Sequence, residues 1–230
     1  MKELLSDSAV FGVVLSILAF QLGSFLKKKW KLAIFNPIFV AVALIIVLLV
    51  LTGINFESFN KGGQYFTFLL TPATVCFAVP LYEQLSVLKK NAKAVLAGII
   101  SGVLTSAVCI FVCALVFRFS HEMYVTLLPK SITTAIGMGQ AEVLGGIPTI
   151  TVAVIAVTGV LGNMIAETVC RLFRITEPVA KGIAIGSSSH AAGTAKAMEM
   201  GEVEGAMSSL SIVISGLLTV VVASVFANFI

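Results

Sequence analysis

A polar, glycine-containing run interrupts one of the apolar segments of this chain and is the first candidate for chemistry. It spans residues 186–196 and reads Gly-Ser-Ser-Ser-His-Ala-Ala-Gly-Thr-Ala-Lys. Unpaired backbone and hydroxyl groups cost several kcal/mol in hydrocarbon, so a membrane protein keeps such a run where it is buried in protein or lines a wet cavity. The run therefore predicts a binding site. Its candidate residues are Ser187, Ser188, Ser189, His190, Gly193 and Thr194.

A second interruption, Thr71-Pro72-Ala73-Thr74, falls in the middle of the apolar segment 62–82. A helix that restarts within the membrane presents unpaired N–H groups and about half a positive charge at its new start. Two such starts that face one cavity make an anion site without a side-chain cation. We expect Pro72 to be the first residue of a second half-helix. The alternative is that Pro72 merely kinks a packed helix.

Lys130 is the cation closest to a third polar segment. It follows Pro129 within 123–141 and precedes Ser131, Thr133 and Thr134. A lysine at the centre of a membrane helix costs about 2.5–3.5 kcal/mol on insertion scales, so it is not expected to face lipid. Two interpretations stay open: a cation that faces the substrate, or one whose amine reaches the membrane surface. For Lys196 the second interpretation is favoured.

His190 and Glu167 are ionisable groups for which several roles are open. His190 can bind an anion, relay a proton, cap a broken helix or serve the structure alone, and it shares a helix face with Thr194. Glu167 has Arg171 four residues later, which favours a structural ion pair over proton coupling. The sequence contains no cluster of metal ligands, no nucleotide-binding glycine loop and no pair of carboxylates beside a nucleophile, so we expect neither an enzyme nor a cofactor.

The composition predicts a protein built into a membrane. Hydrophobic residues make up 58% of the chain and charged residues 11%, against about 25% charged in an ordinary soluble domain. The basic cluster 27–31 flanks two apolar segments, which indicates a topological role and no nucleic-acid partner. The charge-free windows that approach or exceed the ~17–25 residues of a membrane-spanning helix are 9–26, 32–56, 62–82, 94–117, 143–166 and 205–230.

The order of elements predicts an all-α helical bundle that crosses the membrane several times. We expect one membrane domain over 1–230, formed by two inverted repeats of about 1–120 and 121–230. Each repeat would contain a broken helix, at 71–74 and at 186–196, and broken segments in corresponding places point to a transporter site. The positive-inside rule places Lys89, Lys90 and Lys93 in the cytoplasm. Arg171, Arg174 and Lys181 join them there if 123–141 is a re-entrant hairpin, which we prefer to a full crossing.

Four ordered motifs resemble the LrgB/CidB family of bacterial membrane proteins. They are TPATVCFAVPLY at 71–82, VTLLPKSITTAIG at 125–137, GGIPTIT at 145–151 and SSSHAAGTAKAMEMGEVEGAM at 187–207. The likeness covers nearly the whole chain, and it does not distinguish the LrgB branch from the CidB branch. Ala192 stands where relatives often have a bulkier apolar residue.

The resemblance implies two functions. One is holin-like or antiholin-like: control of murein hydrolase activity, autolysis and programmed cell death with a small LrgA- or CidA-type membrane partner. The other is transport of small carboxylates such as pyruvate, glycolate or glycerate. Both imply a multi-pass protein of the bacterial cytoplasmic membrane, and a carrier of this size is expected to be a homodimer. A regulatory pore without specific transport, or a scaffold for the partner, stays the alternative.

Overall fold

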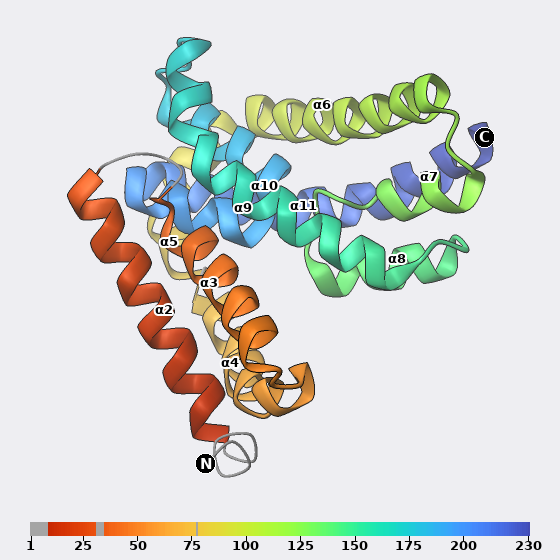
Figure 1. Cartoon of the computed structure of the whole chain (residues 1–230). Coiled ribbons are helices and arrows are strands. Elements are labelled where there is room, and N and C mark those ends of the chain that lie inside the picture. The colour runs from red at the N-terminus through yellow and green to blue at the C-terminus, as the bar shows by residue number, and fades with distance from the viewer. Residues whose placement is uncertain (1–8, 31–34, 77) are drawn as a thin grey trace. The chain divides into compact units, whose positions relative to one another are not determined.

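The computed structural model describes residues 9–30, 35–76 and 78–230, and gives only the backbone at 70, 71, 73, 74, 78, 80 and 81. Its described elements are helices, as expected (Figure 1). The chain divides into two compact units, Met1–Cys76 and Phe77–Ile230, which we call unit 1 and unit 2 and describe separately.

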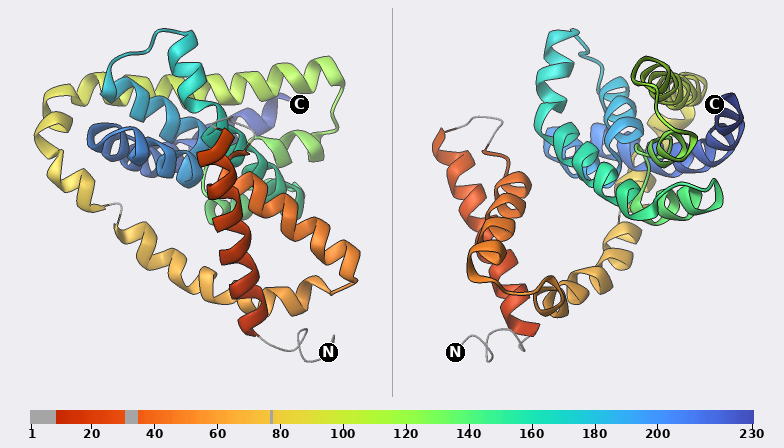
Figure 2. Two further views of the ribbon diagram at one scale, coloured as in Figure 1. Left: turned by 60° about the vertical axis from the view of Figure 1, so that its left-hand side comes forward. Right: turned by 45° about the vertical axis from the view of Figure 1, so that its right-hand side comes forward.

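The described part of unit 1 contains three helices: α2 (Ala9–Trp30), α3 (Pro37–Thr52) and α4 (Phe56–Cys76). Asn36 caps α3, because its Oδ1 accepts hydrogen bonds from the backbone N–H groups of Ile38 at 2.9 Å and Phe39 at 3.3 Å. Gly12 of α2 and Gly62 of α4 bring the two backbones so close that a Cβ on either would clash with the other. α4 therefore packs on α2 near the beginning of α2, and α3 lies alongside α2 (Figure 2).

The prediction of a half-helix that begins at Pro72 is wrong. α4 continues through Pro72 to Cys76, and α5 (Ala78–Glu83) follows. A proline within a membrane helix loses one backbone hydrogen bond, but neighbouring groups can satisfy the freed carbonyl, so the helix can continue. The side chains of Thr71, Ala73 and Thr74 lie outside the described residues, and their predicted role stays a prediction.

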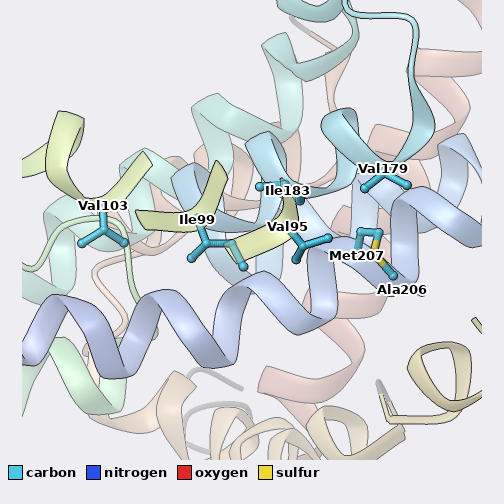
Figure 3. Close-up of a cluster of buried hydrophobic side chains, with 7 residues drawn as sticks. All are labelled: Val95, Ile99, Val103, Val179, Ile183, Ala206 and Met207. Atoms are coloured by element: carbon cyan, nitrogen blue, oxygen red, sulfur yellow. The ribbon is translucent and has the colours of Figure 1, made fainter. Parts of the chain in front are cut away.

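Three long helices frame unit 2: α6 (Leu85–Phe117), α9 (Pro148–Leu172) and α11 (Glu202–Phe226), which ends in the short 3₁₀ helix η2 (Ala227–Phe229). One hydrophobic core joins α6, α11 and the first part of α10 (Pro178–Met200) (Figure 3). Its buried residues recur at i, i+4 and i+8 along α6, as one face of a helix requires. They are Val95, Ile99, Val103, Val179, Ile183, Ala206 and Met207.

Four of the described helices are long and apolar enough to cross a membrane: α2, α6, α9, and α11 together with η2. Two of the six charge-free windows do not correspond to such a helix. α3, within 32–56, has 16 residues and is about 24 Å long, short of the ~30 Å hydrocarbon core. The window 62–82 is divided between α4 and α5.

Residues 121–143 form a helix–turn–helix instead of one long helix. α7 (His121–Leu127) and α8 (Thr134–Val143) have 7 and 10 residues, and Pro129 and Lys130 lie in the turn between them. Thr126 near the end of α7 accepts a hydrogen bond from the Ile147 backbone N–H at 2.8 Å. Gly137 of α8 packs against Ile155 of α9. Both short helices are thereby fixed to the first half of α9.

α10 is interrupted at His190, as the sequence predicts. His190 has φ 42° and ψ −138°, so residues 178–189 and 191–200 form two helical arms. A Cβ on Gly193 would lie 3.0 Å from the Ile185 side chain, although a straight helix would separate these residues by about 12 Å. Ala197 shares a small core with the same isoleucine. The two arms therefore run antiparallel, and α10 doubles back on itself.

The two helical hairpins, α7–α8 and α10, enter unit 2 from opposite ends. At the beginning of α11, Glu204 meets Gly182 of the first α10 arm, and Gly205 meets Met198 of the second. At its far end, the carbonyl of Phe226 accepts a hydrogen bond from the Tyr124 hydroxyl at 3.0 Å. Between these ends, the turn of each hairpin points toward the middle of the unit.

Candidate functional site

The candidate site lies where the turns of the two hairpins approach each other, and Lys130 is at its centre. The Lys130 Nζ donates to Ser131 Oγ at 2.9 Å and to Ser106 Oγ of α6 at 3.3 Å. The two hydroxyl oxygens lie 3.3 Å apart, so one of them donates to the other. Ser106 is at the middle of the charge-free stretch 94–117, which puts the lysine near the centre of the apolar layer.

Lys130 and the two serines retain hydrogen-bond donors that a ligand could use. An ammonium group has three N–H donors, and the contacts with Ser106 and Ser131 use two. One hydroxyl hydrogen of the serine pair is also left over. Within the part of the chain that the structure describes, no ion pair includes Lys130. Lys130 is half-buried, and a charge withdrawn from water is normally paired, so a carboxylate would supply the counter-charge and accept both donors.

A cavity of about 650 Å³ extends from Lys130 between α6 and the first arm of α10. We call it the α6–α10 cavity. Asn91 near the start of α6 and Glu177 before α10 line its outer part, and Lys130 and Ser131 line its inner part. Besides Ser131, the hydroxyl and thiol groups along its wall are those of Ser101, Thr105, Ser106, Cys109, Ser187 and Ser188.

A second cavity, of about 350 Å³, lies on the other side of the same arm, between α9 and α10. Lys130 and Ser188 line both cavities. The second cavity is more apolar, and Thr158 and Ser189 are among its polar lining residues. Both volumes fall in the range of about 300–1,000 Å³ in which proteins bind small molecules.

The three serines at the turn of α10 are held by their own helix. Ser187 Oγ donates to the Ile183 carbonyl and Ser188 Oγ to the Ala184 carbonyl, each at 2.7 Å. Ser188 and Ser189 lie 3.1 Å apart at their Oγ atoms. The hydroxyls of Ser187 and Ser188 thus satisfy backbone carbonyls in this state, and a bound anion would receive a hydrogen bond from either only after a rotation about χ1.

His190 lines neither of the two cavities. Its Nε2 lies 2.9 Å from the Ile155 carbonyl of α9, and because a carbonyl only accepts, this nitrogen carries the proton. Thr194 Oγ1 donates to the His190 carbonyl at 3.0 Å and lies 2.7 Å from Ser208 Oγ. Gly193 allows the two arms to pack closely. Among the roles left open for His190, these contacts support the structural one.

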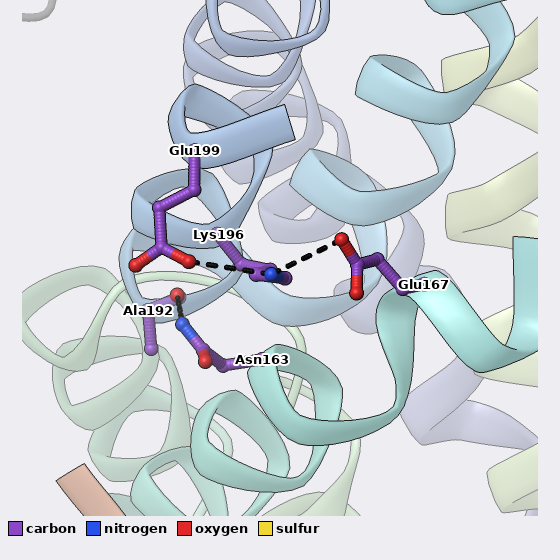
Figure 4. A network of polar contacts seen from close by, with 5 residues as sticks. All are labelled: Asn163, Glu167, Ala192, Lys196 and Glu199. Atoms are coloured by element: carbon purple, nitrogen blue, oxygen red, sulfur yellow. Dashed lines mark hydrogen bonds and ion pairs between the residues drawn. The ribbon is translucent and has the colours of Figure 1, made fainter. Parts of the chain in front are cut away.

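A polar network fixes the second arm of α10 to α9 (Figure 4). Lys196 Nζ lies 3.3 Å from a carboxylate oxygen of Glu167 and 3.2 Å from one of Glu199. Asn163 donates to the Ala192 carbonyl at 2.6 Å. Glu167 thus pairs with Lys196 and not with Arg171 as predicted. The Lys196 side chain is 12% exposed and points to these carboxylates, whose own side chains are 53% and 59% exposed, and its reach to the membrane surface stays a prediction.

The structure brings together five of the predicted binding residues. Lys130, Ser131, Ser187, Ser188 and Ser189 line the cavities. The described residues that line them do not include the remaining candidates of unit 2, which are Thr133, Thr134, His190, Gly193 and Thr194.

Sequence reasoning missed the contribution of α6. Gly98, Gly102 and Ser106 recur every four residues, which is most simply a stripe for helix packing. The stripe does pack: a Cβ on Gly102 would lie 2.9 Å from Ser187 Oγ. Ser106 also binds Lys130, however, and the interleaved Ser101 and Thr105 line the cavity. The hydroxyls of Ser101 and Thr105, one turn apart in an otherwise apolar helix, were the sequence signal that could have indicated a polar wall.

Comparison with known proteins gives the family. The LrgB-like family profile matches residues 16–229. Proteins named antiholin-like protein LrgB from Bacillus cereus and Bacillus anthracis are 39% identical over 221 residues, which is 96% of this chain and 96% of theirs. No solved structure matches the chain at a significant level. The chain belongs to the LrgB-like family.

Proposed function

We propose that this LrgB-like family member is a secondary carrier for small carboxylates such as pyruvate, glycolate or glycerate. The observation that carries the proposal is Lys130, a lysine at the middle of the apolar layer whose described partners are two serine hydroxyls. A charged group in such a place is rare and marks a substrate or ion pathway. The carboxylate would bind the Lys130 ammonium and the hydroxyls of Ser106 and Ser131.

The arrangement of the hairpins supports a carrier. The arms of α10 and of α7–α8 are each 7 to 12 residues long, about 10–18 Å, so each hairpin reaches about halfway across a bilayer. We propose that both are re-entrant and that their turns meet near the midplane, where discontinuous helices form transporter sites. Two inverted repeats over about 1–120 and 121–230, and a contribution from Thr71 to Thr74, remain part of the proposal.

The charge of the site favours monoanions. Lys130 is the cation among the lining residues of both cavities, and Glu177 adds a negative charge at the outer part of the larger one. One positive charge can balance one carboxylate, and a second carboxylate would be left without a partner in a medium of low dielectric constant.

Uptake into proteoliposomes tests the proposal. We expect saturable flux of labelled pyruvate or glycolate in the native protein, and a loss of at least tenfold in Lys130→Met, because loss of a charge-assisted hydrogen bond costs about 1.5–3 kcal/mol. Lys93→Met is the matched control, since Lys93 is an exposed lysine of α6 outside both cavities. Flux that is absent for every short carboxylate, or equal in both variants, would contradict the proposal.

A second candidate function is suggested by the name of the relatives, antiholin-like protein LrgB. In this alternative the chain regulates murein hydrolase activity and autolysis in the cytoplasmic membrane, with a small LrgA- or CidA-type partner or as a homodimer. The two functions can coexist, since carboxylate flux changes the proton balance across the membrane.

Leakage measurements separate the two candidates. A pore of the holin type would release dyes much larger than pyruvate from liposomes, whereas a carrier would retain them. Autolysis that no longer depends on this protein when carboxylate is withheld would link the two functions.

A further inference from the structure

The cavities around Lys130 extend from it in one direction only. On α6 their lining residues run from Asn91 to Cys109, and on α9 from Thr158 to Cys170. On α10 they belong to the first arm and its turn. The start of α6, the end of α9 and the start of α10 all lie at the same end of unit 2, because Asn91 and Glu177 line one cavity.

The opposite end of unit 2 is filled by side chains. Ile110 and Ala114 of α6 pack there with residues of α7 and the end of α11 in one core. Tyr124 is completely buried in that core. Its hydroxyl donates to the Phe226 carbonyl at 3.0 Å, and His121 Nδ1 lies 2.7 Å from the carbonyl oxygen of Ile230. α7 is thereby fastened to the end of α11.

Charge distinguishes the two ends. Lysines and arginines flank the open end, at Lys89, Lys90, Lys93, Arg171, Arg174 and Lys181. Over 94–170, which includes the closed end, the lysine and arginine residues are Lys130 itself and Arg118. By the positive-inside rule the open end is cytoplasmic.

We infer that this structure is the cytoplasm-facing state of the carrier, with the α7–α8 hairpin and the end of α11 as the seal toward the other side. The inference rests on the proposed function. Release of the carboxylate at the closed end requires α7 to separate from α11. This separation breaks the hydrogen bond between the Tyr124 hydroxyl and the Phe226 carbonyl. Tyr124 is therefore a positioning residue that favours the cytoplasm-facing state.

Accessibility of single cysteines tests this inference in the full chain. In a background in which Cys76, Cys109, Cys113 and Cys170 are replaced, Thr105→Cys reports on the cavity wall. Lys90→Cys and Arg118→Cys mark the two ends. A membrane-impermeant charged maleimide is added to right-side-out and to inverted vesicles. We expect Thr105→Cys to react from the same side as Lys90→Cys, and Arg118→Cys to react from the other side.

The hydroxyl of Tyr124 supplies the second measurement. Adding Tyr124→Phe to the Thr105→Cys variant is expected to raise its labelling from the Arg118 side by about two- to tenfold, the change in population that one hydrogen bond supports. A reaction of Thr105→Cys that is equally fast from both sides, or faster from the Arg118 side, overturns the inference. One-sided labelling without carboxylate flux supports this access route and removes the carrier function.

Discussion

At the scale of single residues, the site depends on small side chains that let the turn of α10 approach its neighbours. Gly162 of α9 is the clearest example, because an added Cβ would collide with the side chain of Ser189. Ser189 is 4% exposed, and the collision includes its Cβ, which a rotation about χ1 does not move. A hydroxyl that lines the smaller cavity is therefore positioned by a glycine on the facing helix.

Gly162→Ala should destabilise the protein. Overpacking a filled site costs about 1–3 kcal/mol, more than the roughly 0.5–1 kcal/mol that alanine gains over glycine in a helix. Gly139→Ala is the matched control, since nothing lies within 4 Å of its Cβ position in α8. Thermal unfolding in detergent should show a lower midpoint for Gly162→Ala and an unchanged or higher one for Gly139→Ala. The reverse order would contradict the packing described for the α10 turn.

His190 combines a strained backbone with a buried ring. Its φ of 42° is in the left-handed region that favours glycine, and its Nε2–H is bonded to the Ile155 carbonyl. Replacing it with alanine loses the hydrogen bond and keeps the strain, whereas glycine loses the hydrogen bond and relieves the strain. We expect His190→Gly to unfold at a higher temperature than His190→Ala, by an amount that corresponds to about 1 kcal/mol or more. Equal midpoints would show that the backbone at His190 is not strained.

At the scale of elements, the interruption of α10 could be predicted and the reversal of its direction could not. Three serines, two glycines and a histidine in an apolar segment indicate a break, because hydroxyls that bond to nearby carbonyls weaken the helix. The angle at the break depends on contacts with Ile155 and Ser208, which belong to helices that precede and follow it. Local sequence holds no information on such contacts.

At Pro72 the sequence predicted the start of a new helix, whereas α4 continues through this residue. Proline at a helix start and proline inside a membrane helix have the same local sequence signature, and surrounding helices decide between them. Pro129 and Lys130, in contrast, lie in a turn, since the short helices on both sides pack on α9 and the chain reverses there. The expected hairpin over 123–141 has this geometry, and its re-entry into the membrane stays a prediction.

At the scale of the whole molecule, composition predicted a helical membrane protein and the ordered motifs predicted its family. Lys130 was one of two candidate cations, with Lys196, and its role became a proposal with support only when Ser106 was found beside it. These two residues are separated by 24 positions and by α7, so no spacing rule joins them. Serine pairs in apolar helices are most simply packing residues, which is why the α6 wall of the cavity was overlooked.

The most direct test of the central claim is an experimental structure determined with a saturating concentration of pyruvate or glycolate. We expect density for a carboxylate within hydrogen-bond distance of Lys130 Nζ and the hydroxyls of Ser106 and Ser131. Lys130→Met under the same conditions should show none. Ligand density elsewhere in the protein, or an empty site at Lys130 while flux is saturable, would contradict the account.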